Sequence, residues 1–180
     1  CKVLVIGAGS NLLIRDNGIN GIALITKKLK EISIDNEGVI SAQAGDTDAE
    51  VARFARDYER AGLEFLLVIP GTIGGGIRMN SGAFGSEFKD ILIDVTAINY
   101  SGPFKICSIA ELEMGYRKIG ISNEWIFCTA RFKSSSGSKK DINNKMKQII
   151  RLRKTAQPIG VKTGGSTFKN PTDHKAWRLI

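Results

Sequence analysis

A glycine-dense stretch between Gly62 and Asp90 constrains this chain more than any other feature of its sequence. Four glycines, at positions 71, 74, 75 and 76, follow directly on the apolar run 66–70. Glycine has no Cβ, so it tolerates positive φ and lets a backbone approach a ligand closely, but it costs chain entropy on folding. Such a concentration predicts either a pair of tight turns or a loop that holds a ligand against the backbone.

The residues after these glycines favour the second interpretation. The run Gly75 to Asn80 is compatible with a short helix. Free N–H groups at a helix start attract anions, phosphate above all. We therefore predict a phosphate or cofactor cradle at this position, with plain turns as the alternative.

A second glycine loop follows the β-branched run 2–6. Its sequence, Gly7-Ala8-Gly9-Ser10-Asn11, places hydroxyl and amide groups behind two glycines. It lacks the third glycine of the dinucleotide-binding fingerprint and no βαβ pattern follows, so by itself it is weak evidence. Two glycine loops in one small domain, both expected to leave buried strands, are stronger evidence for a phosphate site.

Length and composition set the limits of the fold. The 180 residues suffice for one well-cored domain and part of a second. With 42% hydrophobic and 24% charged residues the chain is typical of a soluble globular protein. No apolar run approaches the roughly 18 residues of a membrane span. The chain begins at Cys1 inside an apolar run and stops at Ile180 in a helix-like segment, so we expect an internal piece of a longer protein.

The cysteines, the single histidine and the net charge limit the kinds of site and partner that this chain can have. Cys1, Cys107 and Cys128 have no metal-type spacing, and an odd number argues against a disulfide framework, so we expect a reducing cytoplasm and no metal. His174 is the only histidine, so a Ser-His-Asp triad would depend on it alone. The net charge of +8 permits nucleic acid, an anionic membrane face or a polyanionic nucleotide as partner.

Much of the positive charge lies between Lys139 and Lys154. Apolar residues recur there at helical spacing, namely Ile142, Met146, Ile149 and Ile150. This pattern predicts an amphipathic helix with a basic, solvated face. A nucleic-acid surface is the alternative, but the segment has no interleaved aromatic residues to stack on bases.

The remaining pattern predicts an α+β fold with many short strands and few helices, unlike a doubly wound sheet. Asp46 or Thr47 is expected to cap a helix from Asp48 to about Ala61, with Gly62 as its stop. The serine-rich run 134–138 is the best linker candidate. Strands are expected at 22–25, 32–34, 39–44, 91–100, 104–106 and 125–132.

Two further segments combine polar side chains with rigid surroundings. Gly115-Tyr116-Arg117 sets a permanent cation beside an aromatic ring, although a surface ion pair is an equally good interpretation. The run from Gly164 to Asn170 presents Ser166 behind two glycines. Without a histidine base this serine is not expected to be a nucleophile, but it can donate a proton or hydrogen bond to a developing anion.

These motifs together resemble the UDP-N-acetylenolpyruvoylglucosamine reductases, flavoenzymes of bacterial cell-wall precursor synthesis. The resemblance covers essentially the whole chain. Four segments occur in the family's order and at compatible spacings: GAGSNLLIRDNGINGIAL, GLEFLLVIPGTIGGGIRMNSGAFGSE, Gly115-Tyr116-Arg117 and GGSTFKNP.

The resemblance implies an FAD-binding domain of the vanillyl-alcohol-oxidase (PCMH) type over residues 1–134, without its N-terminal part. Part of an α+β substrate-binding domain, without its C-terminal part, would follow over 135–180. Tyr116, Lys169 and Asn170 would bind substrate, no nucleic acid or membrane is expected as a partner, and protein partners are left open. The residues that match the family's FAD loops are Gly7, Gly9, Ser10, Asn11, Leu12, Pro70, Gly71, Thr72, Gly74, Gly75, Asn80 and Gly82.

The implied reaction reduces UDP-N-acetylglucosamine-enolpyruvate to UDP-N-acetylmuramate, with NADPH reducing the flavin first. The enolpyruvyl ether then takes a hydride at its terminal alkene carbon, which leaves enolate-like charge on the carboxylated side. Arg117 would stabilise that charge through the carboxylate, and Ser166 would protonate the adjacent carbon. A serine hydroxyl is a poor acid in water, so it needs a dry site and a neighbouring cation, for which Lys169 is the candidate.

Two departures from the family are visible. Its third catalytic group, a glutamate near the C-terminus, lies beyond residue 180, and Phe84 stands where many members carry tyrosine. We therefore expect this piece alone to be inactive. The alternatives are a basic nucleic-acid-binding module or another flavin oxidoreductase on the same scaffold. The second predicts covalent flavin attachment through His or Cys, which neither glycine loop offers.

Overall fold

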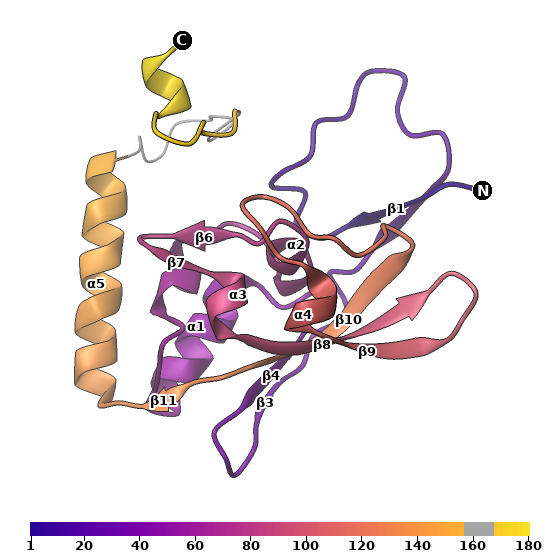
Figure 1. Ribbon diagram of the computed structural model, residues 1–180. Coiled ribbons are helices and arrows are strands. Elements are labelled where there is room, and N and C mark those ends of the chain that lie inside the picture. Colours follow the sequence, from indigo (N-terminus) through magenta and orange to yellow (C-terminus); the bar gives the residue numbers. More distant parts are fainter. Residues whose placement is uncertain (157–167) are drawn as a thin grey trace.

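The computed structural model describes residues 1–156 and 168–180. Its centre is a five-stranded sheet in the order β3-β4-β10-β8-β9, in which all neighbours are antiparallel (Figure 1). The expected α+β class is confirmed. The strands are β3 Ile32–Ile34, β4 Ile40–Gln43, β8 Leu92–Asn99, β9 Phe104–Ser108 and β10 Trp125–Phe132.

Short helices pack against this sheet, and one long helix lies at the edge of the fold (Figure 1). The helices are α1 Asp48–Asp57, the 3-10 helix η1 Glu64–Val68, α2 Ile73–Arg78, α3 Phe88–Ile91, α4 Ile109–Leu112, α5 Lys139–Ala156 and the 3-10 helix η2 Ala176–Arg178. The described residues also form three two-stranded pairs: β1 Val3–Ile6 with β2 Ile22–Ile25, β5 Arg60–Ala61 with β11 Ser135–Ser136, and β6 Gly82–Ala83 with β7 Ser86–Glu87.

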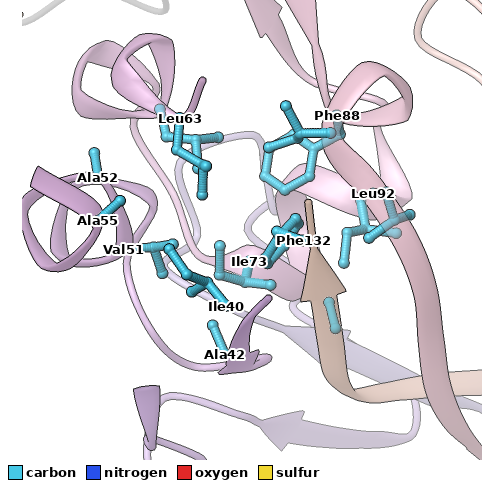
Figure 2. Packing of buried hydrophobic residues seen from close by; sticks show 14 of the residues in the cluster. Ile40, Ala42, Val51, Ala52, Ala55, Leu63, Ile73, Phe88, Leu92 and Phe132 are labelled. Atoms are coloured by element: carbon cyan, nitrogen blue, oxygen red, sulfur yellow. The ribbon is translucent and has the colours of Figure 1, made fainter. Parts of the chain in front are cut away.

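One apolar core fills the space between the sheet and the helices (Figure 2). Alternate residues of a strand face the same side, so Ile40 and Ala42 of β4 are both fully buried while Ser41 between them is not. The other labelled core residues in Figure 2 are Val51, Ala52, Ala55, Leu63, Ile73, Phe88, Leu92 and Phe132.

Helix α1 begins as predicted and ends early. Thr47 is its N-cap, and the Thr47 hydroxyl and the Glu50 carboxylate form a capping box. The helix stops at Asp57 instead of near residue 61, because residues 60–61 pair as β5 with β11. Glu59, with φ of 56°, makes the turn between the two, so the predicted glycine stop at Gly62 is wrong.

The serine run predicted as a linker is hydrogen-bonded to the body of the protein. Arg60 Nε donates to Ser134 Oγ over 2.8 Å, and Ser135–Ser136 pair with β5. The following helix α5 is amphipathic as predicted, with Ile142, Met146 and Ile149 buried against η1 and α1. The fourth apolar residue of the pattern, Ile150, is 37% exposed. The division into two domains near residue 134 stays a prediction.

The pair β1–β2 is parallel and lies outside the five-stranded sheet. All four residues of β2 are exposed, and β1 is only half-buried, so the expectation that the first glycine loop leaves a buried strand is wrong. The strands pair only with each other, and in the described part of the chain nothing covers their outer face. Within the described residues, no helix has both the length and the hydropathy to cross a membrane.

Candidate functional site

The structure brings the two glycine loops together. Ser10 Oγ in the first loop donates to the Pro70 carbonyl in the second over 3.0 Å, across 60 residues of sequence. A Cβ on Gly7 would overlap Thr72 Oγ1, so only glycine lets the first loop pack this closely against the Thr72 side chain. A Cβ on Gly75 would lie 3.8 Å from the same oxygen. The Thr72 hydroxyl of the second loop therefore packs against the first loop at Gly7.

The helix behind the second loop begins earlier than predicted. Helix α2 starts at Ile73, with Thr72 as its N-cap. The N–H of Ile73 donates to the Asp46 carbonyl at 2.9 Å, and the N–H of Gly74 donates to the Ala44 carbonyl at 3.0 Å. These two groups are thus not free to bind an anion, contrary to the simple helix-start argument.

Two buried side chains beside the loops have no hydrogen-bond partner in the described part of the chain. They are Thr72, whose hydroxyl is unpaired, and Asp48, whose two carboxyl oxygens are both unpaired. Asp48 is fully buried, and this burial raises its pKa to about 8, so the carboxyl is protonated at neutral pH. Buried polar groups are nearly always paired, so this arrangement fits a ligand that brings hydrogen-bond acceptors.

Sequence reasoning missed Asp48. At the first position of a helix an acidic residue is expected for its favourable interaction with the helix dipole, and most such residues are exposed. The only available signal was that Asp48 directly follows a strong N-cap and precedes the apolar face of α1. Its burial depends on loop 70–72 folding over it, where its backbone N–H donates to the Gly71 carbonyl at 3.4 Å.

The side chain of Asn80, a residue predicted to bind the cofactor, makes all of its observed hydrogen bonds within the protein. Its Nδ2 donates to Glu87 Oε2 at 2.9 Å and to the Gly115 carbonyl at 3.1 Å. Its Oδ1 accepts from the Lys89 N–H at 3.0 Å. The side chain therefore ties two loops together, and any cofactor contact would have to come from its backbone.

Gly115, whose carbonyl accepts one of these hydrogen bonds, lies two residues before the predicted catalytic residue Arg117. Arg117 has φ of 52°, which is left-handed and uncommon for a residue with a side chain. Such a backbone costs about 1–3 kcal/mol and persists only where its surroundings hold it. The Arg117 guanidinium lies 5.5 Å from the centroid of the Tyr116 ring. Within the described residues Arg117 forms no ion pair, so the surface ion pair that we weighed is not observed there.

An open groove of about 720 Å³ lies beside this turn. The N–H of Asn170 donates to Tyr116 Oη over 3.3 Å, so two of the predicted substrate residues are in contact. The cationic residues Lys175 and Arg178 line the same groove. Lys169, the third predicted substrate residue, is exposed, and Ser166 lies outside the described residues.

The other predicted cofactor residues occupy three places. Gly9, Asn11 and Leu12 lie on the exposed loop after β1, which projects from the fold (Figure 1). Gly74 and Gly75 lie in α2, and a Cβ on Gly74 would come within 3.0 Å of the Ala44 Cβ. Gly82 lies in β6, where a Cβ would press against β7 at 2.8 Å from the Glu87 Cβ. The close packing of β6 against β7 therefore explains why glycine is needed at position 82, and no ligand contact is required.

The mixed fold and the joined glycine loops define a nucleotide-cofactor-binding domain. The chain belongs to the FAD binding domain family, whose model matches residues 1–108. The fold is of the vanillyl-alcohol-oxidase type, as predicted. Cholesterol oxidase from Brevibacterium sterolicum shares it at a TM-score of 0.54 over 75% of this chain, although only 11% of residues are identical.

Named relatives confirm the resemblance found from the motifs. The chain is 44% identical over 179 residues to the UDP-N-acetylenolpyruvoylglucosamine reductase of Paramagnetospirillum magneticum, and 43% identical to that of Orientia tsutsugamushi. The alignments cover 99% of this chain but only 58% and 60% of those proteins. The crystal structure of the Thermus caldophilus reductase matches 99% of the chain and 65% of its own, at 33% identity and a TM-score of 0.87.

Proposed function

We propose that this chain carries the flavin-binding part and the start of the substrate-binding part of an FAD-dependent UDP-N-acetylenolpyruvoylglucosamine reductase. The observation that most directly supports this is the meeting of two glycine loops around the buried Thr72 hydroxyl. The relatives named above suggest the substrate. We place the domain boundary near residue 134 and the reaction in the cytoplasm, with NADPH as reductant.

The joined loops fit the diphosphate-bearing part of FAD. Gly7 leaves room for the close contact with Thr72, whose buried hydroxyl has a hydrogen bond still to give. Ser10 already joins the first loop to the second and fixes their spacing. When bound, FAD would supply the hydride that is added to the enolpyruvyl double bond. The role of the chain is to hold the cofactor and orient the substrate beside it.

The turn 115–118 and the adjacent groove fit the substrate. Arg117 has a permanent positive charge and a planar fork, which suit a carboxylate that gains enolate-like charge. The left-handed backbone fixes the direction of this side chain, and the tie through Asn80 supports that backbone. In the groove, Tyr116 and Asn170 would contact the UDP portion.

The proton would come from Ser166, in a segment outside the described residues. One hydride and one proton together saturate the double bond, the proton being added to the carbon next to the carboxylate. Lys169, which follows three residues later, would favour proton loss from the serine by stabilising the alkoxide.

The test is a visible absorption spectrum of the complete gene product, before and after anaerobic NADPH. We expect a yellow protein that bleaches with NADPH and regains its colour when the enolpyruvyl UDP-sugar is added. The flavin of Arg117→Ala should bleach normally, but turnover should fall by about 100-fold or more. A loss of this size is typical when a hydrogen-bond donor to a transition-state oxyanion is removed. Lys118→Ala removes a neighbouring exposed cation and should have no such effect.

Two results would contradict the proposal. A colourless protein that takes up no added FAD would exclude a flavoenzyme. A yellow protein that bleaches with NADPH but is not reoxidised by the enolpyruvyl UDP-sugar would exclude this substrate and leave the fold and cofactor standing.

A further inference from the structure

Asp48 lies where three segments of the cofactor cradle meet. It is the first residue of α1, and its backbone N–H donates to the Gly71 carbonyl. A Cβ placed on Gly71 would be 3.4 Å from both Asp48 Oδ2 and Ser10 Oγ. The carboxyl is thus on the same side of loop 70–72 as the serine that joins the two glycine loops.

Among the described residues, no basic side chain pairs with this carboxyl. Segments 7–10 and 70–77, which form the cradle around it, carry no titratable side chain. Several charged groups on α1, on the elements packed against it and beside its start are engaged elsewhere. Asp46 accepts from the N–H groups of Glu31 and Gln43, Glu50 pairs with Lys30, Asp57 with Lys139, Glu64 with Lys145, and Arg60 binds Ser134.

The protonation state follows from this environment. Burial away from water raises the pKa of Asp48 to about 8. An ionised carboxylate would repel the diphosphate of a dinucleotide, whereas a neutral carboxylic acid can donate its O–H to an anionic oxygen. A short O–H···O⁻ hydrogen bond of this kind is stronger than one between two neutral groups.

We propose that Asp48 binds the dinucleotide as a neutral acid and donates a hydrogen bond to a diphosphate oxygen of FAD. Nothing in the motifs that identify the glycine loops assigns this residue a role. The inference rests on the flavin site of the proposed function and not on the identity of the reduced substrate. It also explains how a fully buried acid without a partner is tolerated at this position.

The experiment measures the dissociation constant for FAD from pH 6.5 to 9.5, by quenching of flavin fluorescence in the complete gene product. For the parent protein we expect constant affinity up to about pH 7.5 and a loss of about tenfold per pH unit above the pKa. Asp48→Asn keeps a neutral donor of the same shape, so its affinity should match the parent at pH 7 and stay flat to pH 9. Asp48→Ala should bind about tenfold more weakly at pH 7.

Asp57→Asn is the matched control, since it removes a carboxylate from the other end of the same helix. It should reproduce the pH profile of the parent. A parent profile as flat as that of Asp48→Asn, or one in which affinity rises with pH, would overturn the proposal. If Asp48→Ala does not fold, the comparison of parent and Asp48→Asn still decides. Failure of every variant to bind FAD would instead reject the flavin site itself.

Discussion

Two adjacent glycines of α2 provide a test of how the central glycine stretch packs. A Cβ on Gly76 would lie 2.5 Å from Phe88 Cε2, about 1 Å closer than ordinary van der Waals contact. The Phe88 ring is fully buried, and the rings of Phe65 and Phe132 pack edge-on at centroid distances of 6.5 and 6.0 Å. Because neither neighbour leaves it room to move, we expect Gly76→Ala to overpack the core.

The magnitude follows from two opposing terms. Overpacking a well-filled core costs about 1–3 kcal/mol, and the enclosed ring places this site at the upper end. Replacing glycine by alanine within a helix stabilises the folded state by about 1 kcal/mol. The free energy of unfolding should therefore fall by about 2 kcal/mol, which for a chain of this size lowers the midpoint of thermal unfolding by about 4–8 °C.

Gly75→Ala is the matched control, because its Cβ would meet nothing nearer than Thr72 Oγ1 at 3.8 Å. It should gain up to about 1 kcal/mol from helix propensity. Both variants are measured by urea unfolding without added FAD, so that a change in cofactor affinity does not contribute. If Gly76→Ala unfolds at the same urea concentration as Gly75→Ala or at a higher one, the packing argument is refuted. Adding Phe88→Leu to Gly76→Ala should recover part of the loss.

Two further predictions concern ion pairs. Lys145→Met should lower the free energy of unfolding by about 1–2 kcal/mol, because the exposed lysine balances the buried carboxylate of Glu64. Lys147→Met, at an exposed position on the same helix, should leave the urea midpoint unchanged; equal losses in both would disprove the anchoring role. The hydrogen bond from Lys30 lowers the pKa of Glu50 to about 2, so its contribution is present above about pH 4.5 and lost as the pH falls through 2. Glu50→Gln keeps the capping acceptor, so it should cost about 1 kcal/mol or less at pH 7 and progressively less toward pH 2 in the same assay.

The regular elements could be predicted because their signals are local. Strand β2 and strand β10 have the predicted bounds, and the amphipathic helix α5 was found from its spacing of apolar residues. Thr47, the observed N-cap of α1, was one of the two residues expected to cap this helix. Where the prediction failed, a distant segment decided: α1 ends early because β5 pairs with β11, more than 70 residues later in the chain.

The candidate site divides in the same way. The sequence by itself determined where the glycine loops are, which family they resemble and which arginine to examine, because each is a short pattern of residue types. Only the tertiary structure decided that Ser10 meets Pro70 and that the Asn80 side chain ties two loops together. It also decided that Asp48 is buried with no hydrogen-bond partner among the described residues. The physical reason is that burial and hydrogen-bond satisfaction depend on which distant segments pack together, and a pKa follows from both.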